Sequence, residues 1–136
     1  MIEVLKVRTP GKGMFEITGP VSKVVANAGV TEGLATVYIR HTSASLVIQE
    51  NADQTARMDL ERWLEKLVNG QEVHFRHTAE GPDDMPAHIK AALTATSLGI
   101  PIMQGTLALG QWQGIYLWEH RAASHDREVV VHVQGD

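Results

Sequence analysis

The sequence predicts an α+β fold in which a mostly antiparallel sheet, curled into a sandwich or barrel, carries about three helices packed on it. Strand-like segments outnumber helix-like segments, and the two kinds do not alternate regularly as they do in parallel α/β proteins. The length of 136 residues suits a single domain, 1–136. A chain of this length buries enough surface on folding to form a core without disulfides or structural metal ions.

The first part of the chain combines short strand patterns with one helix. Strands are predicted over 3–7, 14–18 and 34–41. The helix before the third strand begins at Thr18, which can cap it, and Pro20 suits its first turn. Gly29 suits its C-terminal end. The apolar residues of this helix share one face, at Val21, Val24, Val25 and Ala28.

The middle of the chain contains the clearest helical pattern. A strand over 46–49 precedes this helix, Asn51 or Asp53 can cap it, and Asn69-Gly70 ends it. Its predicted buried stripe consists of Leu60, Trp63, Leu64 and Leu67. We therefore expect this face of the helix to pack against the sheet.

The last part of the chain returns to strands after one more helix. A strand over 72–77 is followed by a loop over 78–85. The third helix is predicted to begin at Pro86 and to end at Gly99, just before Pro101. Its predicted inward residues are Ile89, Ala92 and Leu93. Strands are then predicted over 100–104, 114–119 and 128–133.

The composition argues against several classes of function. The chain has no cysteines, which excludes disulfides, thiolate metal sites and cysteine nucleophiles and fits a reducing compartment. Its formal net charge of −4 argues against nucleic-acid binding, which requires a basic face. No apolar run approaches the roughly 18 residues of a membrane span, and the first residues lack a signal-peptide pattern. We therefore expect a cytoplasmic protein with no nucleic-acid partner and no membrane partner.

Four apolar strand faces each end in an ionisable side chain. Because side chains alternate along a strand, each of these groups shares a face with the apolar residues before it. The four groups are His41, Glu50, His77 and Glu119. Polar residues are common where strands end, since these positions meet water. If the four ends converge, however, they form a polar pocket at one rim of the core, and the recurrence favours this interpretation.

His88 gives an independent indication of a site. It falls in the first turn of the third helix, where the helix dipole disfavours a cationic ring. A neutral imidazole is the form that a metal ligand or a general base requires. The alternative is that His88 simply packs beside Ala91 and Ala92.

A metal site would require histidines that meet only through folding, because the chain has no HExxH motif. His41, His77 and His88, with Glu50 or Glu119 nearby, suit Zn²⁺ or a similar divalent ion. Such a set is compatible with an open coordination position, which catalysis requires. The other histidines are interpreted as surface or exposed residues: His74, His120, His125 and His132.

Phosphate binding has comparable support. Hydroxyl and backbone donors beside Arg40 and His41 belong to Thr42, Ser43 and Ser45. The segment 105–110 contains glycines that allow a close approach of the backbone to a ligand. It matches neither the Walker pattern nor the dinucleotide pattern, and glycines in loops usually serve turns.

Three motifs resemble those of the YjbQ-like family, and together they cover nearly the whole chain. The first runs from His41-Thr42-Ser43-Ala44-Ser45-Leu46 to Gln49-Glu50-Asn51-Ala52-Asp53. The second comprises His77-Thr78-Ala79-Glu80-Gly81 and Ala87-His88-Ile89-Lys90. The third comprises Gly105-Thr106-Leu107-Ala108-Leu109-Gly110-Gln111-Trp112-Gln113 and Trp118-Glu119-His120-Arg121. Departures at Gln111 and at Pro82-Asp83-Asp84 concern the ligand contacts, not the family.

The resemblance implies a small α+β protein with a barrel-like sheet that assembles as a homotrimer. The family is labelled a secondary thiamine-phosphate synthase. That reaction joins a pyrimidine methyl diphosphate to a thiazole phosphate and releases diphosphate. Carried over residue by residue, the polar site comprises His41, Glu50, Asn51, His77, His88 and Glu119.

The first hypothesis is therefore an enzyme, a transferase of the thiamine-phosphate synthase type that handles a phosphorylated small molecule with a divalent metal (Zn or Mg). The expected catalytic residues are His41, Glu50, Asn51, His77 and Glu119. The expected metal ligands are His77 and His88. The expected substrate-binding residues are Thr42, Ser43, Lys90 and Arg127, with Arg40 as another cation. The alternatives are a noncatalytic module that binds a metal or a phosphorylated metabolite, and a structural oligomer whose histidines line subunit contacts.

Overall fold

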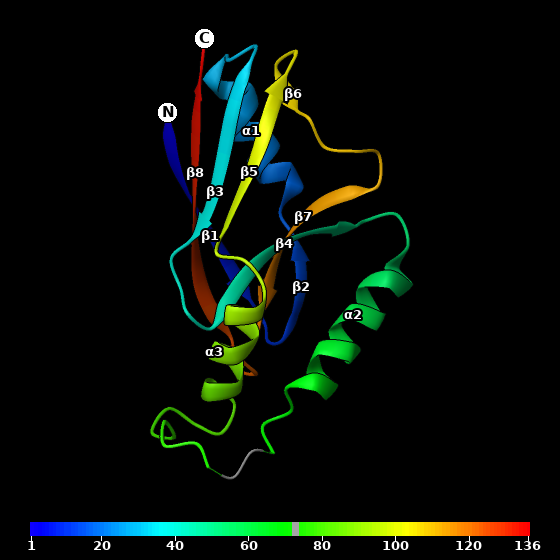
Figure 1. The fold of residues 1–136 in the computed structure, drawn as a ribbon. Helices are drawn as coiled ribbons and strands as arrows, with labels where there is room; N and C mark the ends of the chain where they lie inside the picture. Colours follow the sequence, from blue (N-terminus) through cyan, green and yellow to red (C-terminus); the bar gives the residue numbers. More distant parts are fainter. Residues whose placement is uncertain (72–73) are drawn as a thin grey trace.

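The structure is a computed structural model that describes residues 1–71 and 74–136. The described residues form an α+β fold of eight strands and three helices (Figure 1). In chain order the elements are β1 (Ile2–Thr9), β2 (Gly13–Glu16), α1 (Thr18–Ala28), β3 (Gly33–Ile39), β4 (Ala44–Glu50), α2 (Gln54–Leu67), α3 (Asp84–Leu93), β5 (Ser97–Met103), β6 (Thr106–Leu107), β7 (Gln113–Glu119) and β8 (His125–Gly135).

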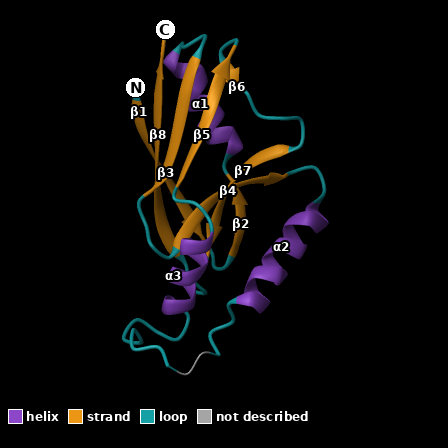
Figure 2. Cartoon of the chain, viewed as in Figure 1, coloured by secondary structure: helices purple, strands orange, loops and turns teal. Residues whose placement is uncertain are grey.

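The strands form two antiparallel sheets, as the predicted fold class requires. The larger sheet has the order β1-β8-β3-β5-β6 and the smaller one the order β2-β7-β4. The core lies between these sheets and α1, and β-branched side chains of α1, β3 and β8 supply much of it. α2 and α3 lie at the end of the molecule opposite the chain termini (Figure 2). No helix in the described parts of the chain is both long and apolar enough to cross a membrane.

α1 follows its predicted periodicity but not its predicted cap. Val21, Val24 and Val25 are buried against the sheets, and Gly29 ends the helix in the left-handed conformation, with φ of 68°. Thr18 does not cap the helix, because its hydroxyl donates to Glu16 and accepts the Ile115 backbone N–H instead. The hydroxyl therefore joins α1 to β2 and β7.

α2 packs far less than its pattern predicts. Of the predicted stripe, only Leu64 is buried, while Trp63 and Leu67 are 63% and 56% exposed. The helix lies beside β2 and β4 (Figure 1) but makes few contacts with them, so the strands bury only a small part of its apolar face. Asp53 caps the helix by accepting the Thr55 backbone N–H at 2.9 Å, which selects between the two predicted caps.

The segment before α3 differs most from the prediction. Glu72 and Val73, in the predicted strand 72–77, lie outside the described residues, and the remainder of that segment is not a strand. The end of this segment instead approaches α3, where His77 contacts Asp84.

α3 begins and ends before its predicted limits and turns a different face inward. It begins at Asp84 rather than at Pro86 and ends at Leu93, six residues before Gly99. The predicted inward residue Leu93 is 59% exposed. The buried residues of the helix are Asp84, Pro86, Ala87, Lys90 and Ala91. Polar side chains thus lie on the buried face, which an apolar periodicity cannot reveal.

Candidate functional site

The start of β4, the end of β7 and α3 meet at one end of the molecule. Ala44 pairs with Glu119 in the smaller sheet, so the residues just before β4 lie beside the end of β7. An isolated bridge between Leu46 and Ala95 holds the end of α3 against β4. Three motifs that are far apart in the sequence therefore reach one region.

Glu119 and Arg127 form a sealed ion pair in this region. The Arg127 guanidinium donates from Nε to Glu119 Oε1 at 2.7 Å and from its NH2 group to Oε2 at 2.5 Å. The Thr9 hydroxyl donates to Oε1 at 2.6 Å, and the Arg121 backbone N–H donates to Oε2 at 3.1 Å. Arg127 also donates to the Ser43 hydroxyl and carbonyl. Each oxygen thus has two donors, as a buried carboxylate requires.

The pKa of Glu119 reflects this enclosure. Burial alone would raise it, but the hydrogen bonds from Arg127 and Thr9 lower the pKa below its ordinary value. Glu119 and Arg127 are only 1% and 3% exposed. The pair is therefore charged and its hydrogen bonds are satisfied, which suits a structural role better than the predicted catalytic and substrate-binding ones, although Glu119 and Arg127 each border a cavity.

His77, Asp84 and His88 form a second, open cluster. Asp84 Oδ2 lies 2.7 Å from His77 Nε2 and 2.9 Å from His88 Nε2. The ligand atoms of the three residues all lie within 4.8 Å of one another. Asp84 is buried, whereas the His77 and His88 side chains are 48% and 27% exposed. The cluster therefore combines a fixed carboxylate with two imidazoles that solvent can reach.

The hydrogen bonds of His88 determine what its second nitrogen can do. His88 Nδ1 lies 2.8 Å from the Thr42 carbonyl oxygen, an acceptor, so Nδ1 carries the hydrogen. In the neutral ring Nε2 then holds a lone pair directed at a carboxylate oxygen. Such a contact requires either a proton on Nε2 or a cation between the two atoms. A histidine whose Nδ1–H donates to a backbone carbonyl is the usual arrangement of a metal ligand.

Arg121 holds Asp84 in place from the other side. Its NH1 group donates to Asp84 Oδ1 at 2.7 Å, and its NH2 group donates to the Glu80 carbonyl. Burial would raise the pKa of Asp84, but the hydrogen bond from His77 and the charge of Arg121 hold that pKa below its ordinary value. Asp84 is therefore ionised and directs one oxygen at the histidines.

His41 lies near this cluster but does not enter it. Its Nε2 accepts the Glu128 backbone N–H at 2.8 Å, so Nδ1 carries the ring hydrogen. Burial, aided by the charge of Arg127, lowers the pKa of His41. His41 and His88 both line a cavity of about 480 Å³ together with Thr42. The neutral His41 thus offers a fixed donor rather than a base.

Two predicted site residues lie elsewhere. Glu50 pairs with Gln113, at the opposite end of β4 and β7 from Glu119, so the four ionisable strand ends do not converge. Glu50 accepts the backbone N–H groups before α2, and Asn51 donates to Glu16. Alternation places a residue on a face of a strand but does not determine which end of the sheet it occupies.

Sequence reasoning missed three residues of this region. The sequence pattern predicts a loop at Asp84, although its spacing of four residues from His88 is typical of a shared helix face. Arg121 belongs to a family motif, but nothing in the sequence indicates its contact with Asp84. His120, interpreted as exposed, is 2% exposed and lies 2.9 Å from the Ser45 hydroxyl. Lys90, predicted to bind substrate, is buried against Glu65 of α2 and away from the histidine cluster.

Comparisons with known proteins agree with this fold. A family model described as "UPF0047 protein YjbQ-like" matches residues 3–136. The chain is 52% identical to the UPF0047 protein sll1880 of Synechocystis over 98% of this chain and 91% of that protein. It is 37% identical to the UPF0047 protein YjbQ of Escherichia coli O157:H7 over 98% of this chain and 97% of that protein.

Solved structures give the same result. A yjbq/upf0047 family protein from Clostridium acetobutylicum superposes with a TM-score of 0.85 at 36% identity, covering 98% of this chain and 99% of that one. A YbjQ-like protein from Sulfolobus solfataricus, at 19% identity, shares the fold with a TM-score of 0.87 over 100% of this chain and 99% of that one. The chain therefore belongs to the YjbQ-like family of UPF0047 proteins.

Proposed function

We propose that His77, Asp84 and His88 bind a divalent metal ion and that the chain uses this site on a phosphorylated small molecule. The observation that supports the proposal most strongly is the pair of imidazole nitrogens within 3 Å of one Asp84 oxygen. Arg121 and the Thr42 carbonyl orient two of the three groups from outside the cluster. Outer contacts of this kind are typical of built metal sites.

The donor set favours zinc over magnesium. Imidazole nitrogens suit Zn²⁺, whereas Mg²⁺ prefers an all-oxygen environment. Two histidines and one carboxylate are also the protein ligands of well-known catalytic zinc sites, in which the fourth position stays open. The two histidines are partly exposed, so a ligand can reach the site from solvent. We therefore narrow the expected choice between zinc and magnesium to zinc.

The cavity beside the cluster suits the body of a small substrate. It measures about 480 Å³ and is lined by His41, Thr42, His88 and Ala91, among others. The size lies within the range of small-molecule sites. His41 also lines a neighbouring cavity of about 470 Å³ that contains the cations Lys6 and Arg8. In this proposal the His41 Nδ1–H donates to a substrate oxygen at the junction of the two cavities.

Thiamine-phosphate synthesis is our candidate reaction. The thiazole nitrogen uses its lone pair to form a bond to the methylene carbon of the pyrimidine. The bond between this carbon and the diphosphate oxygen breaks, and diphosphate leaves with the electron pair of the broken bond. A bound divalent metal supplies a positive charge for the departing diphosphate. The chain's own contribution is to orient the substrate through His41 and Thr42. It also fixes His77 and His88 through Asp84. The family resemblance supports this reaction together with a homotrimer, and the lack of cysteines supports a cytoplasmic location.

Metal analysis tests the site. Protein purified without chelator or affinity-tag metal should contain close to one zinc ion per chain, and His88→Ala and His77→Ala should lose it. His132→Ala, a histidine on β8 at the far end of the larger sheet, provides the matched control and should retain the metal. A metal-free parent that also fails to take up added zinc would contradict the proposal.

Turnover separates an enzyme from a binding module that uses the same pocket. Zinc-loaded protein is mixed with pyrimidine methyl diphosphate and thiazole phosphate, and diphosphate release is followed over time. The proposal predicts many product molecules per chain and a loss of at least about 100-fold in His88→Ala. Stoichiometric uptake without product would favour the noncatalytic module.

A further inference from the structure

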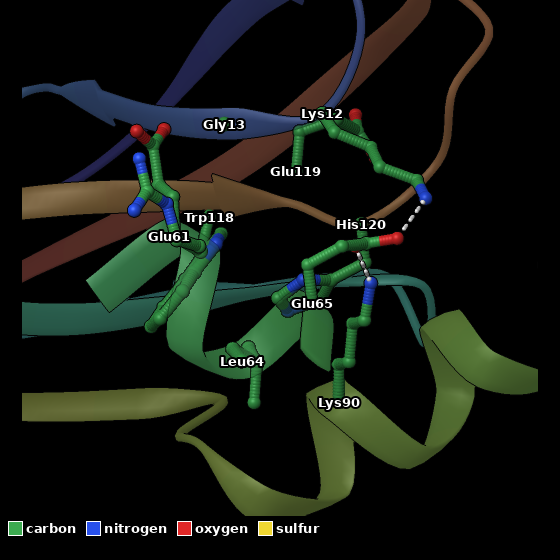
Figure 3. A pocket seen from close by; sticks show the side chains of 10 residues that line it. Lys12, Gly13, Glu61, Leu64, Glu65, Lys90, Trp118, Glu119 and His120 are labelled. Carbon is green, nitrogen blue, oxygen red and sulfur yellow. Dashed lines mark hydrogen bonds and ion pairs between the residues drawn. The ribbon is translucent and has the colours of Figure 1, made fainter. Parts of the chain in front are cut away.

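A third cavity, of about 340 Å³, lies between α2, the turn before β2 and α3 (Figure 3). It opens on a different face of α3 from the histidine cluster. Lys90 follows His88 by two residues, and such side chains diverge by roughly 200° around a helix. Lys90 lines this cavity, whereas His88 lines the one beside the cluster. The two cavities can therefore hold different ligands.

A buried cation forms one wall of this cavity. Lys90 is 3% exposed, and its Nζ lies 2.5 Å from Glu65 Oε2. Lys12 approaches the other oxygen of the same carboxylate at 2.9 Å (Figure 3). Within residues 1–71 and 74–136, Glu65 is the only side-chain acceptor recorded for either ammonium. Because an ammonium has three donors, both cations can bind a further acceptor.

A buried neutral histidine adds a further donor. His120 is 2% exposed, and burial, aided by the charge of Lys90, lowers its pKa to about 3. Its Nε2 is 2.9 Å from the Ser45 hydroxyl, and in the tautomer in which this hydroxyl donates to Nε2, the ring hydrogen is on Nδ1. His120 lines the cavity, so its ring can take part in the contacts of a ligand there.

The rest of the wall is mixed, and the Glu65 side chain covers the cations. Glu61, Arg62 and Glu119 also line the cavity, but Glu61 accepts the Met14 backbone N–H and Glu119 is paired with Arg127. Trp118 and Leu64 line the cavity and are 7% and 5% exposed. Glu65 is about half exposed, at 45%, and lies on α2, of which Leu64 is the only buried residue. The carboxylate can therefore swing towards solvent without loss of core packing. It occupies the position that an anionic ligand would take.

We propose that this cavity binds a small organic anion, whose acidic group replaces the Glu65 carboxylate at Lys90 and Lys12 and whose apolar body lies against Trp118 and Leu64. The site is distinct from the zinc site and does not depend on it. The Lys90 and Lys12 ammonium groups converge on the Glu65 carboxylate, and the Trp118 ring lines the same cavity. This combination recognises a phosphate or carboxylate group attached to an aromatic ring, and not a free inorganic ion.

Phenyl phosphate and benzoate are suitable probes, titrated at pH 7 in the presence of a chelator and followed by the NMR signal of the Trp118 indole. The proposal predicts saturable binding of at least one of them, and the stronger of the two identifies the preferred acidic group. Inorganic phosphate, without a ring, and benzyl alcohol, without a charge, should each bind about tenfold or more weakly.

Two substitutions should act in opposite directions. Lys90→Met should weaken binding about tenfold or more, whereas Glu65→Gln should strengthen it several-fold, because the internal competitor loses its charge. Lys23→Met and Glu3→Gln, which change exposed residues outside this cavity, are the matched controls and should leave the dissociation constant unchanged. Glu65→Gln changes a half-exposed side chain, so it remains informative if Lys90→Met fails to fold.

The proposal is overturned if neither probe binds the parent or Glu65→Gln. Weaker binding to Glu65→Gln than to the parent would also overturn it, since Glu65 would then be a contact and not a competitor. His88→Ala should bind both probes as the parent does. Failure at this cavity therefore leaves the zinc proposal standing, and loss of zinc leaves this one standing.

Discussion

Two ionic clusters lie side by side in this protein, and they differ in how completely their hydrogen bonds are satisfied. In the first, each oxygen of Glu119 receives two donors, and Arg127 is almost entirely buried. In the second, two imidazole nitrogens face one oxygen of Asp84, and the contact of His88 requires a proton or a cation. A closed cluster stabilises the fold, whereas an open one can bind a ligand.

Arg121 connects the two clusters. Its backbone N–H donates to Glu119, and its guanidinium donates to Asp84. The end of β7 is thus held by the closed cluster while it positions the open one. We expect the closed cluster to govern stability and the open cluster to govern metal affinity, and the following experiments test this division.

The largest effect on stability should come from Arg127→Met. The substitution leaves the Glu119 carboxylate buried without its partner, and breaking a buried ion pair in this way costs about 3–5 kcal/mol. Urea denaturation measures the free energy of unfolding. Arg8→Met is the control, because Arg8 pairs with Asp126 at the surface, where such a pair contributes about 0–1 kcal/mol. Equal losses in the two variants would show that the buried pair has no special structural role.

Zinc should have the next largest effect. At a zinc concentration 100-fold above the dissociation constant, the parent should gain about 2.7 kcal/mol of stability. His88→Ala should lose this gain and, without metal, should cost about 1–2 kcal/mol, because it removes the hydrogen bond to Thr42 and the contact with Asp84. Thermal denaturation with zinc and with chelator measures both quantities. His132→Ala should respond to zinc as the parent does.

Acid should weaken the closed cluster. Burial opposes the shift, but Arg127 and Thr9 lower the pKa of Glu119 in the folded state below its unfolded value. The cluster therefore contributes its full stability above the unfolded pKa, about 4.3, and loses it as the pH falls through the folded pKa. Urea denaturation between pH 7 and pH 3 should show a steeper loss in the parent than in Glu119→Gln. Parallel curves would contradict this assignment.

The fold could be predicted because its signals are local. The apolar spacing of Val21, Val24 and Val25 and the glycine at position 29 determine α1, and alternation identifies most strands. The same kind of spacing predicts too much burial for α2. Periodicity identifies the face of a helix that can be buried, but not how much of the sheet packs against that face. Trp63 is on that face and is 63% exposed.

The site could be predicted only in part, because it depends on which ends of the elements meet. His77 and His88 were expected as metal ligands from helix position and motif, and the structure brings both to Asp84. Asp84 itself follows a proline and another aspartate and gives the pattern of a loop. Its role depends on α3 beginning two residues before Pro86. Strand pairing, and not alternation, decides that Glu119 is near this site and that Glu50 is not.

The smallest effect should come from Glu50→Gln, which tests that separation. Glu50 and Ala44 are the opposite ends of β4, and only the Ala44 end approaches the histidine cluster. Glu50 accepts the N–H groups of Ala52 and Asp53 at 2.8 Å, so its amide analogue should cost about 0.5–1 kcal/mol of stability. Zinc affinity, measured by calorimetry, should equal that of the parent. Glu50 contributes a carboxylate to one of the family motifs. If zinc binds this variant more weakly than the parent, Glu50 belongs to the site as the motif suggests, and its separation from the histidine cluster in the structure does not exclude it.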